Sequence, residues 1–200
     1  MTLQNESFYV TVEACMDVDD LGSKIEDDPI IYPKSVSQQR VHKGLFITAI
    51  SKEHTLKIAL IGDGYTDLKH CAVLKENVLT ILQNDLMVQL DVANGSLIRD
   101  RDFEWCGCNL ELYQLENDYL IYGEEYIVRL DDALKEKWRF SGKDIFVSIS
   151  GKQPFELGPD SIRLYDFQDN FYEIDFRGNS LQSQILDLIQ SHGNRIHSNC

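Results

Sequence analysis

The chain has 200 residues, of which 33 are acidic and 19 are basic, so its formal net charge is −14. Apolar residues make up 43% and charged residues 26%, a balance typical of a folded globular protein and not of a disordered chain. The negative charge excludes binding to nucleic acid through phosphate contacts and adsorption to an anionic membrane, because both require a surplus of lysine and arginine.

The N-terminus shows neither the basic nor the apolar region of a secretory signal, and no apolar run reaches the roughly 18 residues of a transmembrane helix. We therefore expect a cytoplasmic protein with one domain over residues 1–200. The five cysteines are odd in number, which favours free thiols. Cys106 and Cys108 form a C-x-C pair without a second pair, and no histidine has a metal-ligand spacing. The sequence predicts neither a metal site nor a cofactor.

Residues 1–43 form an acidic N-terminal region with eight acidic and four basic side chains. One strand is predicted here, over Phe8–Val12. Further along, Pro29 and Pro33 flank Ile30–Tyr32, and proline disfavours a central strand. Beyond the first strand we predict an irregular or partly helical excursion.

Residues 44–179 are dominated by short runs of Val, Ile, Leu, Tyr and Phe between turn residues, a pattern typical of all-β proteins. The predicted strands are Leu45–Ile50, Leu56–Ile61, Val78–Leu82, Leu86–Val92, Leu110–Leu115, Tyr119–Tyr122, Tyr126–Leu130, Trp138–Phe140, Ile145–Ile149, Ile162–Tyr165 and Phe171–Phe176.

Residues 180–200 are predicted to form a helix and a tail. Leu181, Ile185, Leu188 and Ile189 have the spacing of one helix face, and Gly193 is suited to end the helix.

Two segments 40 residues apart resemble each other. Glu76–Asp91 and Glu116–Asp131 are identical at 6 of 16 positions, and Ser161–Asp175 keeps the rhythm of strand, turn, strand and aspartate. A period of about 40 residues in an all-β chain indicates a repeated four-stranded unit.

The repeats resemble the blades of quinoprotein-type (PQQ-type) β-propellers, in which an aspartate at a strand end precedes a turn and a strand with tryptophan. More specifically, residues 44–179 resemble uncharacterised bacterial proteins with a WxFSGxDIFV signature, which here spans Trp138–Val147, followed by Leu164–Gly178. Arg99 stands where the repeat expects tryptophan, and three or four units fall short of a typical ring. The resemblance therefore implies architecture and carries over neither the quinone cofactor nor an activity.

The expected fold is all-β, with antiparallel blade-like meanders in three or four units and a C-terminal helix on one edge. A small or incomplete propeller-like arrangement is favoured, and a two-sheet sandwich is the alternative.

Two groups of residues are candidate sites. The first is an acidic, tyrosine-rich cluster that could recognise a protein, although tyrosine also suits strand packing; it comprises Tyr113, Tyr119, Tyr122, Glu124, Glu125 and Tyr126. The second is the set of strand-end acids Asp91, Asp131 and Asp175. These could line a pocket at the mouth of the blade array, or cap turns.

The function we expect is that of a non-enzymatic module that binds a basic protein, because an acidic field accelerates association with a basic partner. A bacterial immunity protein that neutralises a cationic toxin is a concrete version. The alternative is a small-molecule-binding protein or an enzyme that uses the strand-end acids.

Overall fold

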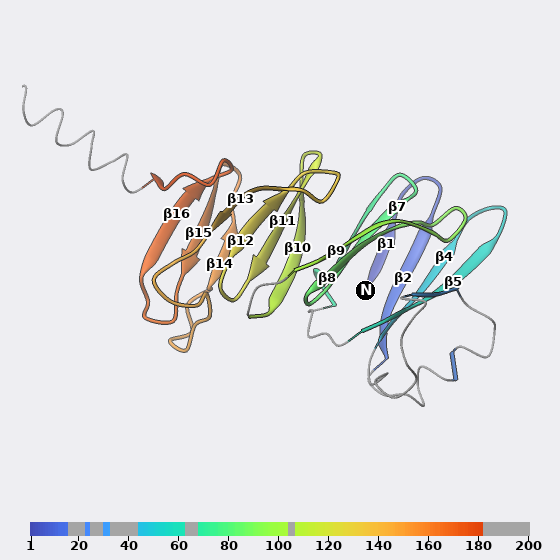
Figure 1. Cartoon of the computed structure of the whole chain (residues 1–200), viewed down its shortest axis with the longest axis horizontal. Helices are drawn as coiled ribbons and strands as arrows, with labels where there is room; N and C mark the ends of the chain where they lie inside the picture. The colour runs from blue at the N-terminus through green and yellow to red at the C-terminus, as the bar shows by residue number, and fades with distance from the viewer. Residues whose placement is uncertain (16–22, 25–29, 33–43, 63–67, 104–106, 182–200) are drawn as a thin grey trace, which may run out of the picture.

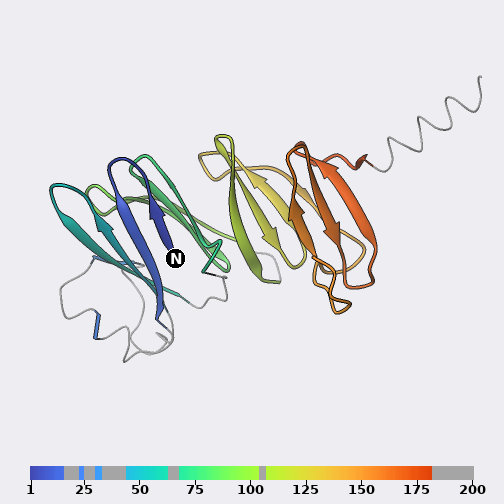
Figure 2. The ribbon, with the colours of Figure 1, turned by 180° about the vertical axis from the view of Figure 1, so that it is seen from behind.

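A computed structural model describes residues 1–15, 23–24, 30–32, 44–62, 68–103 and 107–181. These residues form four β-sheets, called A to D in chain order, which lie side by side in a row (Figures 1 and 2). The chain is therefore all-β, as predicted. Four sheets in a row are not a two-sheet sandwich, so that alternative is wrong.

Sheet A has the strand order β1-β2-β4-β5-β3. Its strands are β1 (Thr2–Gln4), β2 (Tyr9–Cys15), β3 (Ile30–Tyr32), β4 (Gly44–Ile50) and β5 (Thr55–Ile61). All neighbours are antiparallel except β3, which pairs with β5 in parallel at the edge of the sheet. The N-terminal region thus contributes three strands to a sheet, and the segment between the prolines is an edge strand.

Sheets B, C and D are antiparallel meanders whose strands pair in chain order. Sheet B holds β6 (Ala72–Lys75), β7 (Val78–Gln83), β8 (Leu86–Asp91) and β9 (Ser96–Asp102). Sheet C holds β10 (Asn109–Leu115), β11 (Asp118–Gly123), β12 (Ile127–Leu130) and β13 (Glu136–Phe140). Sheet D holds β14 (Phe155–Leu157), β15 (Ser161–Tyr165) and β16 (Phe171–Asp175).

The two segments that resemble each other in sequence occupy matching hairpins. In sheet B a two-residue turn, Glu76-Asn77, joins β6 to β7, and in sheet C Glu116-Asn117 joins β10 to β11. Both glutamates have a positive φ, 53° and 57°, which tight hairpin turns require. The shared Glu-Asn pair therefore marks the same turn in two sheets.

Three apolar cores fill the spaces between successive sheets. The first core joins sheets A and B and includes Ile47 and Leu79. The second joins sheets B and C and includes Leu82 and Ile121. The third joins sheets C and D and includes Leu120. Each sheet thus packs mainly on its neighbours in the row, as in solenoid proteins.

The predicted strand Ile145–Ile149 is wrong. It pairs with no strand, and Ile149 is 77% exposed, whereas Phe146 is fully buried in the core between sheets C and D. The Phe146 amide donates to the Glu124 carbonyl at 2.6 Å, and its own carbonyl accepts from the Tyr122 hydroxyl at 2.5 Å. The apolar run anchors the connection from sheet C to sheet D through one ring and does not form a ladder.

The predicted C-terminal helix lies almost entirely in residues 182–200, outside the described part of the chain. Ser180 still forms an antiparallel bridge with Ile174 on the free edge of β16. Within the described ranges, no helix has the length and apolar character needed to cross a membrane.

Candidate functional site

The turns at one end of the strands form a continuous rim along the row, here called the turn edge. It comprises residues 5–8, 51–54, 76–77, 92–95, 116–117, 131–135, 158–160 and 176–179. The turn edge follows from the meander topology, because alternate turns of a meander lie at the same end of their sheet.

Hydrogen bonds between neighbouring sheets hold the turn edge together. Asn5 Nδ2 donates to the Glu76 carbonyl at 2.7 Å between sheets A and B, and Lys75 Nζ donates to Asn117 Oδ1 at 2.8 Å between B and C. Between C and D, Arg129 Nη1 donates to the Phe176 carbonyl at 2.6 Å. The turns of all four sheets therefore present one connected surface.

The strand-end acids lie at this edge, where each stabilises its own turn: Asp131 is part of it, and Asp91 and Asp175 directly precede its turns 92–95 and 176–179. Asp131 Oδ1 accepts the amides of residues 133 and 135 at 2.9 and 2.8 Å, and Asp175 Oδ1 accepts those of residues 177 and 179 at 2.8 Å. Asp91 Oδ1 accepts the Ala93 amide at 2.9 Å. The three carboxylates belong to three different sheets, and each accepts hydrogen bonds from its own turn; Asp91 also accepts one from Asn77 in the neighbouring turn of sheet B.

The turns after Asp131 and Asp175 have the same geometry. In each, the aspartate amide donates to the carbonyl four residues ahead, at 2.8 and 2.9 Å, and the residue before that carbonyl has a positive φ. That residue is Leu134 in one turn, with a φ of 60°, and Gly178 in the other, with a φ of 82°. Burial alone would raise the pKa of Asp175, but hydrogen bonds from Asn179 and from the turn amides lower it.

A charged network lies just below the turn edge in sheet C. Asp118, whose side chain is 7% exposed, accepts from Arg129 Nε at 2.6 Å and from Lys137 Nζ at 2.7 and 2.9 Å. Burial would raise the pKa of Asp118, yet the hydrogen bonds from these two cations outweigh it and lower the pKa. Because Arg129 also binds the Phe176 carbonyl, the network ties sheet C to sheet D.

Carboxylates outnumber cations on the turn edge. Six acidic residues on it are exposed and have no turn-capping hydrogen bond, namely Glu6, Glu53, Glu76, Glu116, Asp132 and Asp160. The cations in the same turns are Lys52, Lys135 and Arg177. Each sheet therefore contributes at least one exposed carboxylate to the edge, and acidic residues are in excess overall, although Glu116 lies 3.9 Å from Arg129 Nη2 and Asp160 is balanced by Arg177 in sheet D.

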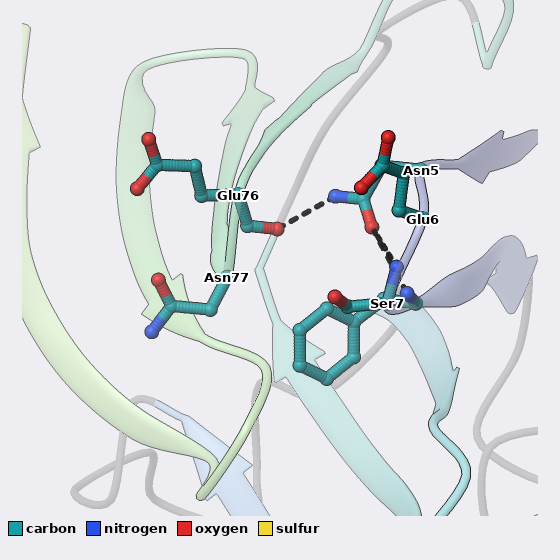
Figure 3. A pocket seen from close by; sticks show the side chains of 6 residues that line it. Asn5, Glu6, Ser7, Glu76 and Asn77 are labelled. Carbon is teal, nitrogen blue, oxygen red and sulfur yellow. Dashed lines mark hydrogen bonds between the residues drawn. The ribbon is translucent and has the colours of Figure 1, made fainter.

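Two adjoining cavities open on the turn edge between sheets A and B. The first has a volume of about 430 Å³ and is lined by Asn5, Glu6, Ser7, Phe8, Glu76 and Asn77. Figure 3 shows Asn5 and Ser7 facing the turn of Glu76 and Asn77, with the carboxylates of Glu6 and Glu76 on opposite sides. The second cavity, of about 360 Å³, shares Glu6, Ser7 and Phe8 and extends to residues 51–54 and Ala93.

Asn5 gives the first cavity a fixed wall. Its Oδ1 accepts the amides of Ser7 and Phe8, each at 2.9 Å, while its Nδ2 holds the Glu76 carbonyl. Opposite, Asn77 Nδ2 donates to Asp91 Oδ1 at 2.9 Å. Both amide orientations are set by their partners, because a carbonyl or carboxylate accepts only from the nitrogen.

Tyr119 and Tyr122 of the predicted acidic, tyrosine-rich cluster are buried, with 4% and 5% exposure, and contribute no exposed surface. Tyr119 packs in the core between sheets B and C, where its hydroxyl oxygen accepts from Thr80 at 2.8 Å and from Gln89 at 3.1 Å. Tyr122 packs on the opposite face, against Phe155. Sheet C has a neighbour on both faces, so β11 is buried at every position.

The other four residues of that cluster lie away from the turn edge or within sheet C. The Tyr113 ring contacts the rings of His70 and Phe155, with centroids 4.8 and 5.3 Å away. Glu124, Glu125 and Tyr126 form the turn between β11 and β12 at the opposite end of the strands. Glu124 Oε2 accepts the Cys108 amide at 3.2 Å, and the Arg139 guanidinium lies 5.2 Å from the Tyr126 ring. The structure thus divides the predicted cluster among two cores and one turn.

Residues 5–8 and the turn at 76–77 were not predicted as site residues. Their contact joins positions 71 residues apart, and neither segment has a catalytic motif. The sequence signal nearest to this site was the repeated Glu-Asn pair, which indicates a turn at residues 76–77 but not that residues 5–8 pack against it. In the described ranges, no three His, Cys, Asp or Glu side chains gather in a way that could hold a metal ion.

Comparison with known proteins gives limited similarity. No protein-family model matches the chain, and no curated protein matches it. Among solved structures, the chain is similar to a protein of unknown function from Bacteroides caccae, with 13% sequence identity and a TM-score of 0.37. The match covers 69% of this chain and 61% of that one, which is less than two thirds of the other protein's length.

Proposed function

We propose that the protein is a non-enzymatic binding module whose turn edge recognises a basic protein. The observation that carries the proposal is the row of exposed carboxylates along the turns of all four sheets. In this proposal the sheets act as blade-like units of a rigid scaffold, and the turns supply the recognition surface, as loops on rigid frameworks commonly do.

Two physical features support this role. A surface with one sign of charge speeds the encounter with a partner of the opposite sign and repels nucleic acid. The aspartate-capped turns and the bonds between Asn5 and Glu76 and between Lys75 and Asn117 also hold the surface in one shape before binding. Such preorganisation lowers the entropy cost of association.

A bacterial immunity protein that neutralises a cationic toxin is the most concrete form of the proposal. The test is co-expression with the product of the neighbouring gene in the native host. We expect the protein to relieve the toxicity of that product and to form a complex with it that dissociates at high salt. A neighbouring product that is neither toxic nor bound would contradict the immunity role.

The broader claim is tested with two matched charge variants. The turn-edge variant carries Glu53→Gln, Glu116→Gln, Asp132→Asn and Asp160→Asn; the control variant removes the same charge elsewhere through Asp85→Asn, Asp100→Asn, Asp102→Asn and Glu156→Gln. All eight residues are exposed. We expect the wild type and the control variant to capture the same basic protein from host lysate, and the turn-edge variant to lose it. Equal capture by all three proteins, or capture of no basic protein, would refute the proposal.

The alternative of an enzyme or small-molecule binder that uses Asp91, Asp131 and Asp175 has less support. Each carboxylate accepts hydrogen bonds from its own turn, and none of them lines either of the two cavities on the turn edge.

A further inference from the structure

Sheet D lacks the fourth strand that completes sheets B and C. In those two sheets the chain turns after the third strand and pairs back along it, as β9 or β13. In the described ranges, β16 pairs only with β15 and, at one position, with Ser180. The place beside β16 that corresponds to β13 in sheet C is therefore open within those ranges, and it is here called the strand slot.

The chain enters the strand slot in the way that it enters β13. The turn after Asp175 has the geometry of the turn before β13, as described above. Ser180 then pairs with Ile174, just as Glu136 pairs with Leu130 at the start of β13. The slot is thus a vacant position of the repeat and not an arbitrary sheet edge.

Backbone groups of β16 point into the strand slot. The Asp175 amide donates to the Asn179 carbonyl at 2.9 Å on this side of the strand. Because alternate residues of an antiparallel strand direct their amide and carbonyl groups to the same side, those of Glu173 point into the slot as well. Such an edge is a template for one more strand.

A row of alternating charge ends at the strand slot. Glu156, Arg163 and Glu173 lie opposite one another on the outer face of sheet D. Arg163 Nη1 lies 3.7 Å from Glu156 Oε1, and its Nε lies 3.3 Å from Glu173 Oε1. The next residue in this row would lie in the slot opposite Glu173, where a cation continues the alternation and an acid is repelled.

The inner side of the strand slot is aromatic. Trp138 Nε1 donates to the Phe176 carbonyl at 3.1 Å, and the centroids of the Phe140 and Tyr172 rings are 5.7 Å apart, so both side chains of β13 lie beside β16. Trp138, Phe140 and Tyr172 pack against the core between sheets C and D but are only partly buried. Because side chains alternate between the faces of a strand, the neighbours of the residue opposite Glu173 would cover this aromatic surface and should be apolar.

We propose that the strand slot binds an extended segment of a partner protein, in which basic and apolar residues alternate, as an added antiparallel strand. This inference rests on the proposed function in that the partner is basic, and it adds a second contact surface. Other occupants match the slot less well. Continued pairing of this chain from Ser180 would place apolar Leu181 opposite Glu173. A second copy would bring its own Glu173 and Asp175 to the same edge, where like charges repel.

The experiment titrates the isotope-labelled full chain with a short blocked peptide of alternating valine and lysine, followed through NMR signals. We expect shifts of the Glu173 and Ile174 amides and of the Trp138 indole, with slower hydrogen exchange of the Glu173 amide. A peptide of the same composition with adjacent lysines should not bind there, and neither should an alternating peptide with N-methylated backbone amides, which cannot donate to the edge.

A pair of variants tests the charge row. Glu173→Gln should weaken binding of the alternating peptide by about 2- to 5-fold, the range for a cross-strand pair of opposite charge. Glu156→Gln removes the same charge from the far end of the row and should leave binding unchanged. Equal effects of the two substitutions, equal binding of the N-methylated peptide, or shifts confined to other residues would overturn the proposal.

Two further outcomes are separable. If the alternating peptide does not bind and the Glu173 amide is already protected in the free chain, residues 182–200 or a second copy cover the edge, and the proposal is wrong. The turn-edge variant described above keeps Glu173, so it should bind the peptide as the wild type does. Peptide binding in the slot without any effect of the turn-edge variant on partner capture would therefore contradict the proposed function and leave the strand slot supported.

Discussion

Removal of the Asp118 carboxylate is predicted to loosen the junction between sheets C and D. Asp118→Ala leaves Arg129, whose side chain is 14% exposed, without its close partner, while Lys137, at 47%, can return to water. Breaking a buried ion pair by removing one partner lowers the free energy of unfolding by about 3–5 kcal/mol. Because Lys137 is half exposed, we expect Asp118→Ala to lie at the lower end, at about 3 kcal/mol. At about 2–4 °C per kcal/mol for a chain of this length, the melting temperature should fall by about 6–12 °C.

The measurement is thermal and denaturant unfolding followed by circular dichroism, with Asp160→Ala as the control. Asp160 is an exposed acid in a turn of sheet D, and its removal should change stability by no more than about 0.5 kcal/mol. If Asp118→Ala is as stable as the control, the network does not hold the two sheets together, and the reasoning from its burial is refuted.

Three further predictions concern stability. Gly178→Ala should destabilise the fold by about 2–4 kcal/mol, because residue 178 has a φ of 82° and a Cβ there would lie 2.8 Å from Trp138 Cδ2. Gly151→Ala is the control: its φ is 84° but no atom lies within 4 Å of the added Cβ, so it should cost only about 1–2 kcal/mol for the backbone conformation. Equal losses of stability for the two variants in denaturant unfolding would refute the clash with Trp138. Tyr119→Phe should lower the free energy of unfolding by about 1–2 kcal/mol, because Thr80 and Gln89 lose a buried hydrogen-bond acceptor. Denaturant unfolding of Tyr165→Phe serves as the comparison. A Tyr119→Phe variant as stable as the wild type would contradict the role given to the Tyr119 hydroxyl. Acid should weaken the fold below about pH 4, because the folded-state pKa values of Asp118, Asp166 and Asp175 are lowered by hydrogen bonds that outweigh burial. Asp166 is a buried residue of sheet D that follows β15, and its carboxylate accepts from Asn170 Nδ2 at 2.9 Å and from the Tyr172 hydroxyl at 2.7 Å. The stabilisation is complete above the unfolded-state pKa and is lost as the pH falls through the folded-state values; denaturant midpoints that do not change between pH 7 and pH 3 would contradict it.

The fold class and most of the strands were predictable from the sequence, because strands buried on one or both faces require alternating or continuous apolar residues, and turn residues separate them. Strand β9 was missed for a physical reason. Ser96–Asp102 is an edge strand that pairs with β8 on one side only, and six of its seven residues are exposed. Charged residues on such an edge prevent aggregation but remove the apolar pattern that would identify the strand. The run Ile145–Ile149 produced the opposite error: its apolar residues predict a strand, but the segment is a connection in which Phe146 alone is buried.

The candidate site was less predictable than the fold. The tyrosines of β11 are suited both to packing in a core and to recognition at a surface. Which role they have depends on whether sheet C is covered on both faces, and that is a property of the tertiary structure, which the local sequence does not specify. Asp131 and Asp175 were correctly considered as turn caps, because aspartate followed by a turn residue has a local physical role. The cavity between Asn5 and Glu76 depends on contacts between distant segments, and no local pattern in the sequence specifies it.

The central claim is that the turn edge is the surface that meets a basic partner. Its most direct test is the association rate of the captured partner, measured by stopped flow at increasing salt for the wild type, the turn-edge variant and the control variant of equal charge. We predict that the turn-edge variant associates more slowly at low salt and depends less on salt than the control variant, because the attraction comes from that edge and not from net charge. If the two variants show the same rates and the same salt dependence, the partner responds to net charge alone, and the turn edge is not its recognition surface.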